Sequence, residues 1–322
     1  MGLITRRQFL QGAAAGAALL GLSRLPLFAR QDDWFSIVAL PDTQYYSQSY
    51  PDVFTDQTMW IRKNVEAWRI AMVVHEGDIT NKNNAEQWRN ADTSMRLLDG
   101  VVPCALAVGN HDMGPGGSAR NRDTRLFRKT FPLERLSSQR GWGGCFEDAH
   151  ENTFYTFTAG GMDFLVVTLE FGPRDEVLTW ANDVVAQHPR HRAMMVTHAY
   201  MSCDDLRIHD IGASPRRYGC GGNDGEEQWE KFARRHPNLF LVLSGHVLGD
   251  GLGRRVDAAE DGHPVHQVLA NYQMKENGGN GWMRILRFHP ALDRVEFFTW
   301  SPYLGVSAID ADNRFAIDYD MA

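Results

Sequence analysis

Residues 101–112 read VVPCALAVGNHD, an apolar run that ends abruptly at Val108 in the polar cluster Gly109-Asn110-His111-Asp112. A short, continuous apolar run of this kind is typical of a strand that is buried on both faces of a sheet. Side chains that follow a buried parallel strand lie at its carboxyl end, where such sheets carry their ligand sites. This stretch therefore predicts a buried strand with a polar site at its end.

The same arrangement occurs four more times along the chain. The other apolar runs are residues 35–40 before Asp42, 70–74 before Asp78, 193–196 before His198 and 239–243 before His246. Stretches with helical spacing of apolar residues separate them, at 61–68, 85–98, 177–185 and 226–235. Strands that alternate with helices predict a largely parallel sheet, with the five polar clusters at one edge.

A second group of strands completes the predicted fold. Residues 154–157 and 163–169 form a hairpin pattern around Gly160-Gly161, and residues 265–269, 283–288 and 295–299 alternate between apolar and polar. We predict that these strands form a second sheet packed on the first, which gives an α/β fold made of a two-sheet β-sandwich flanked by helices. The stretches 113–144 and 200–224 are predicted to be long functional or mobile loops.

The side chains at the strand ends are metal ligands in type. Carboxylate and amide oxygens together with imidazoles suit Mn, Fe or Zn, and the absence of thiolates at these positions argues against a structural zinc knot. The candidate ligands are Asp42, Asp78, Asn110, His198 and His246.

The order of these motifs resembles that of the calcineurin-like metallophosphoesterases, whose pattern is DxH, GD, GNH(D/E), H and GHxH. The resemblance covers about residues 34–250, and it implies a four-layer metallophosphoesterase architecture. It implies that Asp78 bridges two metal ions and that the second ion is held by Asp78, Asn110, His198 and His246. It also implies that His111 protonates the leaving oxygen or steadies the transition state, with Asp112 orienting its ring.

Two family ligands of the first metal are replaced in this chain. Gln44 stands where the family has the histidine of DxH, and Leu248 stands where it has the last histidine of GHxH. The first ion would then keep Asp42 and Asp78, with the carbonyl oxygen of Gln44 and the carboxylate of Asp250 as further candidates. Replacing imidazole by oxygen favours Mn, Mg or Ca and weakens binding, so we predict one firmly bound metal and one labile metal.

The resemblance implies a metal-dependent hydrolase of phosphate esters, acting on a phosphomonoester or a phosphodiester by means of a metal-activated hydroxide. The expected partner is thus a small-molecule or phosphorylated substrate. Two alternatives remain open from the sequence. The chain could be a non-catalytic protein that binds phosphorylated or acidic ligands on a partly lost metal site, or a metal-dependent hydrolase of another kind of ester.

The first 29 residues are predicted to be an export signal of the twin-arginine type. Arg6-Arg7 precede Phe9 and Leu10, and an uncharged stretch follows that is too short to span a bilayer. We therefore expect an interaction with export machinery, no stable membrane insertion after signal removal, and a periplasmic or secreted protein in which residues 30–322 form one calcineurin-like phosphoesterase domain. Export permits disulfides, and a bond between Cys203 and Cys220 is one of the pairings that the four cysteines allow.

The composition limits the partners of the general surface. The 322 residues include 33 lysines and arginines against 40 aspartates and glutamates, a net charge of −7. Residues 1–29 carry three arginines and no acid, so the predicted mature protein is more acidic still. This balance argues against general nucleic-acid binding, since such binding depends on neutralising backbone phosphates with basic side chains.

Overall fold

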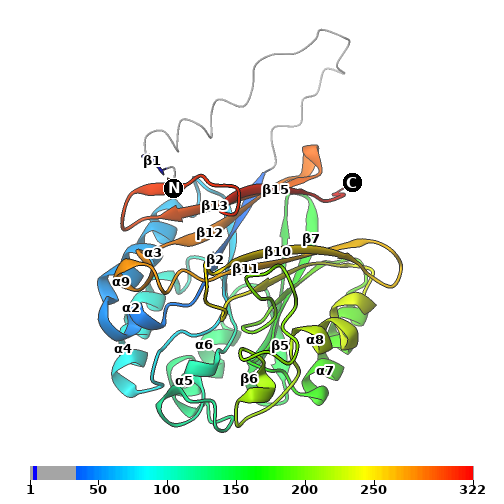
Figure 1. The fold of residues 1–322 in the computed structure, drawn as a ribbon. Coiled ribbons are helices and arrows are strands. Elements are labelled where there is room, and N and C mark those ends of the chain that lie inside the picture. Colours follow the sequence, from blue (N-terminus) through cyan, green and yellow to red (C-terminus); the bar gives the residue numbers. More distant parts are fainter. Residues whose placement is uncertain (1–2, 6–33, 322) are drawn as a thin grey trace.

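The computed structural model describes residues 3–5 and 34–321 (Figure 1). The predicted export signal lies outside these residues except for Leu3–Thr5, which form the short strand β1 at the edge of a sheet, paired with β14. Within the part of the chain that is described, no helix is both long enough and apolar enough to cross a membrane.

The first sheet has the strand order β1-β14-β13-β12-β2-β3-β4, and β15 also pairs with β13. Three of its strands run parallel to each other: β2 (Phe35–Leu40), β3 (Ile70–His75) and β4 (Cys104–Leu106). The antiparallel remainder comprises β12 (Met283–His289), β13 (Arg294–Ser301), β14 (Val306–Ala308) and β15 (Arg314–Asp318).

The second sheet has the order β10-β11-β9-β8-β7-β6-β5. Its parallel centre consists of β7 (Met162–Thr168), β8 (Arg192–Val196), β9 (Leu239–Ser244) and β11 (Pro264–Ala270). Its antiparallel edges are β5 (Trp142–Phe146) and β6 (Ala149–Ala159) on one side and β10 (Leu252–Ala258) on the other.

The core between the sheets follows from the alternation of side chains along each strand. Ile37 and Ala39 of β2 belong to one buried cluster with Phe164 and Val166 of β7, so these side chains face the opposite sheet. The ring of Phe35 lies 5.3 Å from that of Phe164 and extends this layer. The intervening side chains of each strand belong to a second cluster, which includes the helices.

Helices cover the outer face of each sheet (Figure 1). On the side of the first sheet lie α2 (Gln44–Ser49), α3 (Pro51–Asn64), α4 (Ala85–Met95) and α9 (Glu276–Gly279), and on the side of the second lie α7 (Asp175–Gln187) and α8 (Gly225–Lys231). The short helices α5 (Arg125–Thr130) and α6 (Leu133–Ser137) interrupt the first predicted loop. The predicted sandwich flanked by helices is therefore confirmed.

The predicted division of strands between the sheets was wrong. The five strands that carry the polar clusters do not form one sheet: β2, β3 and β4 lie in the first sheet, whereas β8 and β9 lie in the second. The strands predicted for the second sheet also divide, because β12 pairs with β2 of the first sheet and β11 pairs with β9 of the second. Apolar runs indicate that a strand is buried, but they do not indicate which strand lies beside it.

Candidate metal centre

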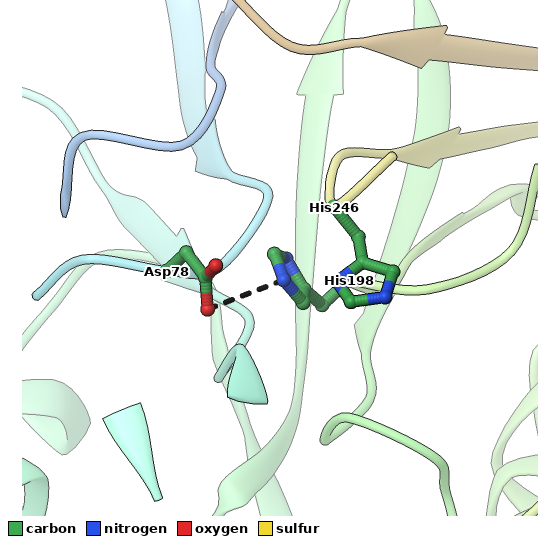
Figure 2. A group of neighbouring side chains, drawn as sticks. All are labelled: Asp78, His198 and His246. Carbon is green, nitrogen blue, oxygen red and sulfur yellow. Dashed lines mark ion pairs between the residues drawn. The ribbon is translucent and has the colours of Figure 1, made fainter. Parts of the chain in front are cut away.

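Three candidate ligands meet where the two sheets adjoin. Asp78 follows β3 of the first sheet, and His198 and His246 follow β8 and β9 of the second. One ligand atom from each lies within 4.8 Å of the other two, and their side chains converge in Figure 2. The candidate ligands thus meet at the ends of their strands, as predicted, but these strands belong to two separate sheets.

His198 is fully buried and has a fixed orientation. Its Nδ1 lies 2.8 Å from the carbonyl oxygen of Glu76, which can only accept, so Nδ1 carries the proton in this hydrogen bond. Its Nε2 faces oxygen atoms, at 3.2 Å from Oδ1 of Asp78 (Figure 2) and 3.1 Å from Oδ1 of Asn110. A histidine whose second nitrogen donates to a carbonyl is the usual arrangement of a metal ligand.

His246 shows the mirror image of this pattern. Its Nε2 lies 2.9 Å from the carbonyl oxygen of Ala213, so Nε2 carries the proton and Nδ1 keeps the lone pair. Its ring packs 5.3 Å from Phe171 and 6.0 Å from Tyr218. His246 also has a φ of 73°, a left-handed conformation that costs free energy in a non-glycine residue and is concentrated at functional sites.

Two glycines let the acidic ligands approach. A Cβ at residue 245 would overlap Oδ2 of Asp42, and a Cβ at residue 109 would overlap Oδ1 of Asp78. Asp42 is buried, and its carboxylate oxygens accept from the backbone N–H of His246 at 3.2 and 3.3 Å. Gly109 and Gly245 are therefore required because any side chain at these positions would collide with an aspartate that follows another strand.

The buried titratable groups of the centre shift one another's pKa values. Burial raises the pKa of Asp42 to about 7. Burial opposes ionisation of Asp78 as well, but the neighbouring His198 overcomes it and holds the pKa of Asp78 below its usual range. Burial would lower the pKa of His198, but Asp78 and Asp42 raise it to about 9, whereas burial and His198 lower that of His246 to about 3. Without a metal, a proton on His198 therefore faces the carboxylates, and a divalent cation fits the same position.

The residues available for a first metal are fewer. Gln44 begins α2, is buried, and its Oε1 has no hydrogen-bond partner among the described residues. An unpartnered buried amide oxygen suits a hard cation beside Asp42. Asp250 lies elsewhere: it is exposed, and its Oδ1 accepts from the backbone N–H of Leu252 at 3.1 Å in the turn before β10. It does not extend the ligand set as the sequence had suggested.

His111 lies beside Asp78. Its backbone N–H donates to Oδ1 of Asp78 at 2.9 Å, and its Nδ1 donates to the carbonyl oxygen of Asn81 at 2.7 Å. The resemblance implies that Asp112 orients this ring, but the hydrogen bonds of Asp112 go to other groups. Asp112 is fully buried, and its oxygens accept from the backbone N–H groups of residues 79, 80 and 109 and from the hydroxyl of Thr80. Asp112 therefore holds the turn after β3 against the turn after β4.

The groups that hold the imidazole rings in place could not be found from the sequence. The groups that fix the imidazoles are backbone carbonyls of Glu76, Asn81 and Ala213, and any residue supplies a carbonyl. A bond between Cys203 and Cys220 is one of the pairings that the four cysteines allow, but all four are free thiols.

This site defines a class of protein. Residues 35–250 match the family model of the calcineurin-like phosphoesterases. The match covers well over half of the chain and spans all five strand-end motifs. The chain therefore belongs to the calcineurin-like phosphoesterase family.

The chain is also similar to individual proteins. The chain is 34% identical over 280 residues to the protein YvnB of Bacillus subtilis (strain 168), and the alignment covers 84% of this chain and 20% of YvnB. The chain thus spans about a fifth of the length of the curated relative it matches. Among solved structures, the purple acid phosphatase PPD1 of yellow lupin (Lupinus luteus) superposes with a TM-score of 0.54 at 14% identity, covering 90% of this chain and 55% of PPD1. This second likeness shows a shared fold.

Proposed function

We propose that the protein is a metal-dependent hydrolase of phosphate esters. The observation that carries this proposal is the preset pair of imidazoles: His198 and His246 each donate one ring N–H to a backbone carbonyl and keep the other nitrogen toward Asp78. Family membership gives the reaction class, and the fold neighbour is described as a phosphatase.

The residues present fit a divalent cation, which we propose to be Mn, Fe or Zn. Asp78, Asn110, His198 and His246 would hold the firmly bound ion, and Asp42, Gln44 and Asp78 a labile one. A cation held there supplies positive charge that neutralises phosphoryl oxygens and activates water for attack on phosphorus. It would also provide the attraction for phosphate that an acidic protein surface lacks.

His111 is the proposed proton donor to the leaving oxygen. Because Nδ1 is held by the carbonyl of Asn81, the free Nε2 is the atom that would carry and release the proton. The carbonyl also stabilises the doubly protonated ring that a general acid requires. The hydrogen bond from the backbone of His111 to Asp78 ties the position of this acid to that of a metal ligand.

The test is an assay of metal-loaded protein on a phosphomonoester and on a phosphodiester. The His198→Ala variant should lose both the firmly bound metal and the activity. The His236→Ala variant removes another buried histidine, whose Nε2 contacts Asn182, and should keep both. Metal binding without hydrolysis of any phosphate ester would favour a binding protein or a hydrolase of other esters.

We also propose that residues 1–29 direct export to the periplasm or the exterior, and that general nucleic-acid binding plays no part in the function. The paired arginines ahead of an uncharged stretch support the first proposal, and the acidic composition supports the second. Replacing Arg6 and Arg7 by lysine should retain the full-length precursor in the cytoplasm, as judged by fractionation.

A further inference from the structure

A cleft of about 570 Å³ opens between the end of β11 and the start of β12, where Tyr272 and Trp282 line it, and the proposed chemistry does not use it. Its apolar lining comes from both sheets: Leu252, Tyr272, Trp282, Leu304 and Ala308. The rings of Tyr272 and Trp282 lie 6.5 Å apart between their centroids. A mostly apolar cavity with a few polar groups is the usual form of a small-molecule site.

The strand register places this cleft next to the metal ligands. Trp282 directly precedes β12, which pairs with β2, the strand that leads to Asp42. Tyr272 follows β11, which pairs with β9, the strand that leads to His246. Neighbouring strands lie about 4.8 Å apart. On each sheet, therefore, the cleft is one strand away from a strand that carries a candidate ligand.

A wall of the cleft also packs directly on the helix that carries Gln44. The cleft is lined by Glu276 and Asn280, which bound the turn of α9. In this turn the backbone N–H of Gly281 donates to the hydroxyl of Tyr46 at 2.9 Å. Tyr46 lies on α2, two residues after Gln44. The cleft and the candidate first metal site thus share a structural support.

The charge of the cleft is strongly negative. Its polar lining includes four carboxylates against a single lysine, namely Asp250, Glu276, Asp310 and Asp312 with Lys275. Over residues 34–321, none of the four carboxylates forms an ion pair. Oδ1 of Asp310 accepts from Nδ2 of Asn313 at 2.8 Å, but its Oδ2 has no partner there. A phosphate group is repelled by such a lining, whereas a cation is attracted.

We propose that this cleft binds one alcohol group of a phosphodiester substrate, and that this group combines an apolar body with a cationic ammonium. The inference rests on the proposed function, because the phosphate of the same molecule would lie at the metal centre. Aromatic rings and unpaired carboxylates together recognise alkylammonium groups. Asp250, which adds no ligand to the metal centre, then has a role in selecting the substrate.

Two diesters that share a leaving group test the proposal. p-Nitrophenyl phosphocholine and its uncharged carbon isostere, p-nitrophenyl 3,3-dimethylbutyl phosphate, differ only in the cationic nitrogen. In each hydrolysis water supplies a hydroxyl to phosphorus and the bond to p-nitrophenolate breaks, with release of a proton. We expect kcat/KM to be roughly ten-fold higher for the choline ester, which corresponds to about 1.4 kcal/mol.

Matched variants locate the effect. Asp312→Asn removes one exposed carboxylate of the cleft and should reduce the choline preference several-fold, whereas Glu66→Gln removes an exposed carboxylate elsewhere and should not. Leu304→Asn should lower kcat/KM for both esters, and Leu292→Asn, which changes an exposed leucine outside the cleft, should leave it unchanged.

The outcomes separate this inference from the proposed function. Equal kcat/KM for the two esters in the unaltered protein would overturn the cleft assignment and leave phosphodiester hydrolysis in place. If neither ester is hydrolysed, calorimetry of the metal-loaded protein with benzyltrimethylammonium decides the matter. Binding that weakens in Asp312→Asn would support a cation site in the cleft while hydrolysis of phosphodiesters fails, and no binding would overturn the cleft assignment too. The phosphomonoester assay then decides the proposed function by itself.

Discussion

The imidazole Nδ1 of His111 lies 2.7 Å from the carbonyl oxygen of Asn81, which fixes the ring beside the candidate metal centre. The carbonyl belongs to the turn that follows Asp78, and the backbone of His111 donates back to Asp78. The position of the proposed acid therefore depends on the same turn as the position of the Asp78 carboxylate.

This arrangement predicts that His111→Asn separates catalysis from metal binding. Turnover should fall by about 10²- to 10⁴-fold, because the proton donor is lost. Metal content should stay near that of the unaltered protein, since no metal ligand changes. Elemental analysis and kcat should be measured on the same preparation, with His198→Ala as the variant that loses both. A parallel loss of metal and turnover in His111→Asn would show that the ring is structural.

Asp112 should prove to be a stability residue. Its buried carboxylate accepts hydrogen bonds from two separate turns, and Asp112→Ala leaves those donors without a partner. We expect a loss of about 3 kcal/mol in the free energy of unfolding, measured by urea titration of the metal-free protein. The exposed Asp56→Ala on α3 serves as the control, with a change within about 0.5 kcal/mol.

A different result for Asp112→Ala would restore the role suggested by the family resemblance. Unchanged stability combined with a large fall in kcat would mean that Asp112 acts through the ring of His111. The two readouts are independent, so the measurement distinguishes a positioning role in catalysis from support of the fold.

Gly245 and Gly212 form a matched pair for testing the approach of Asp42. A Cβ at residue 245 would overlap Oδ2 of Asp42, whereas a Cβ at residue 212 would meet open space. Gly245→Ala should therefore displace Asp42 and reduce kcat on the order of 100-fold, the cost of a small misplacement in a catalytic site. Gly212→Ala should leave kcat unchanged. Equal kcat values for the two variants would show that catalysis does not depend on the observed position of Asp42.

The sequence alone was sufficient to find the three candidate ligands that the structure brings together. Asp78, His198 and His246 each follow a buried strand, and the ends of parallel strands converge whichever sheet they belong to. This is why the site prediction survives an error in the assignment of strands to sheets. An apolar run and the spacing of apolar residues are local patterns, so a few neighbouring residues are enough to predict a buried strand.

The pairing of strands within a sheet and the contacts of backbone groups could not be predicted in the same way. The pairing of β12 with β2 joins the two ends of the domain, and no local pattern specifies it. The family motif likewise gives Asp112 a place next to His111, but neighbours in sequence point in different directions in the turn Asn110–Asp112. Cys203 and Cys220 flank one loop without bonding, because spacing in sequence does not fix the distance between two thiols.

Gln44 gives the last prediction, which concerns the labile metal. Its unpartnered Oε1 offers a neutral oxygen where a carboxylate would bind a divalent cation more firmly. After dialysis against a chelator, the unaltered protein should retain one metal ion per chain, and Gln44→Glu should retain close to two. Gln48→Glu places the same charge on the exposed side of α2 and should behave like the unaltered protein. The metal-free Gln44→Glu protein should be less stable than the unaltered one, because it adds a buried carboxylate beside Asp42, and it should gain more in Tm when Mn is added. Two ions retained by the unaltered protein would contradict a labile first site and show that oxygen ligands suffice there.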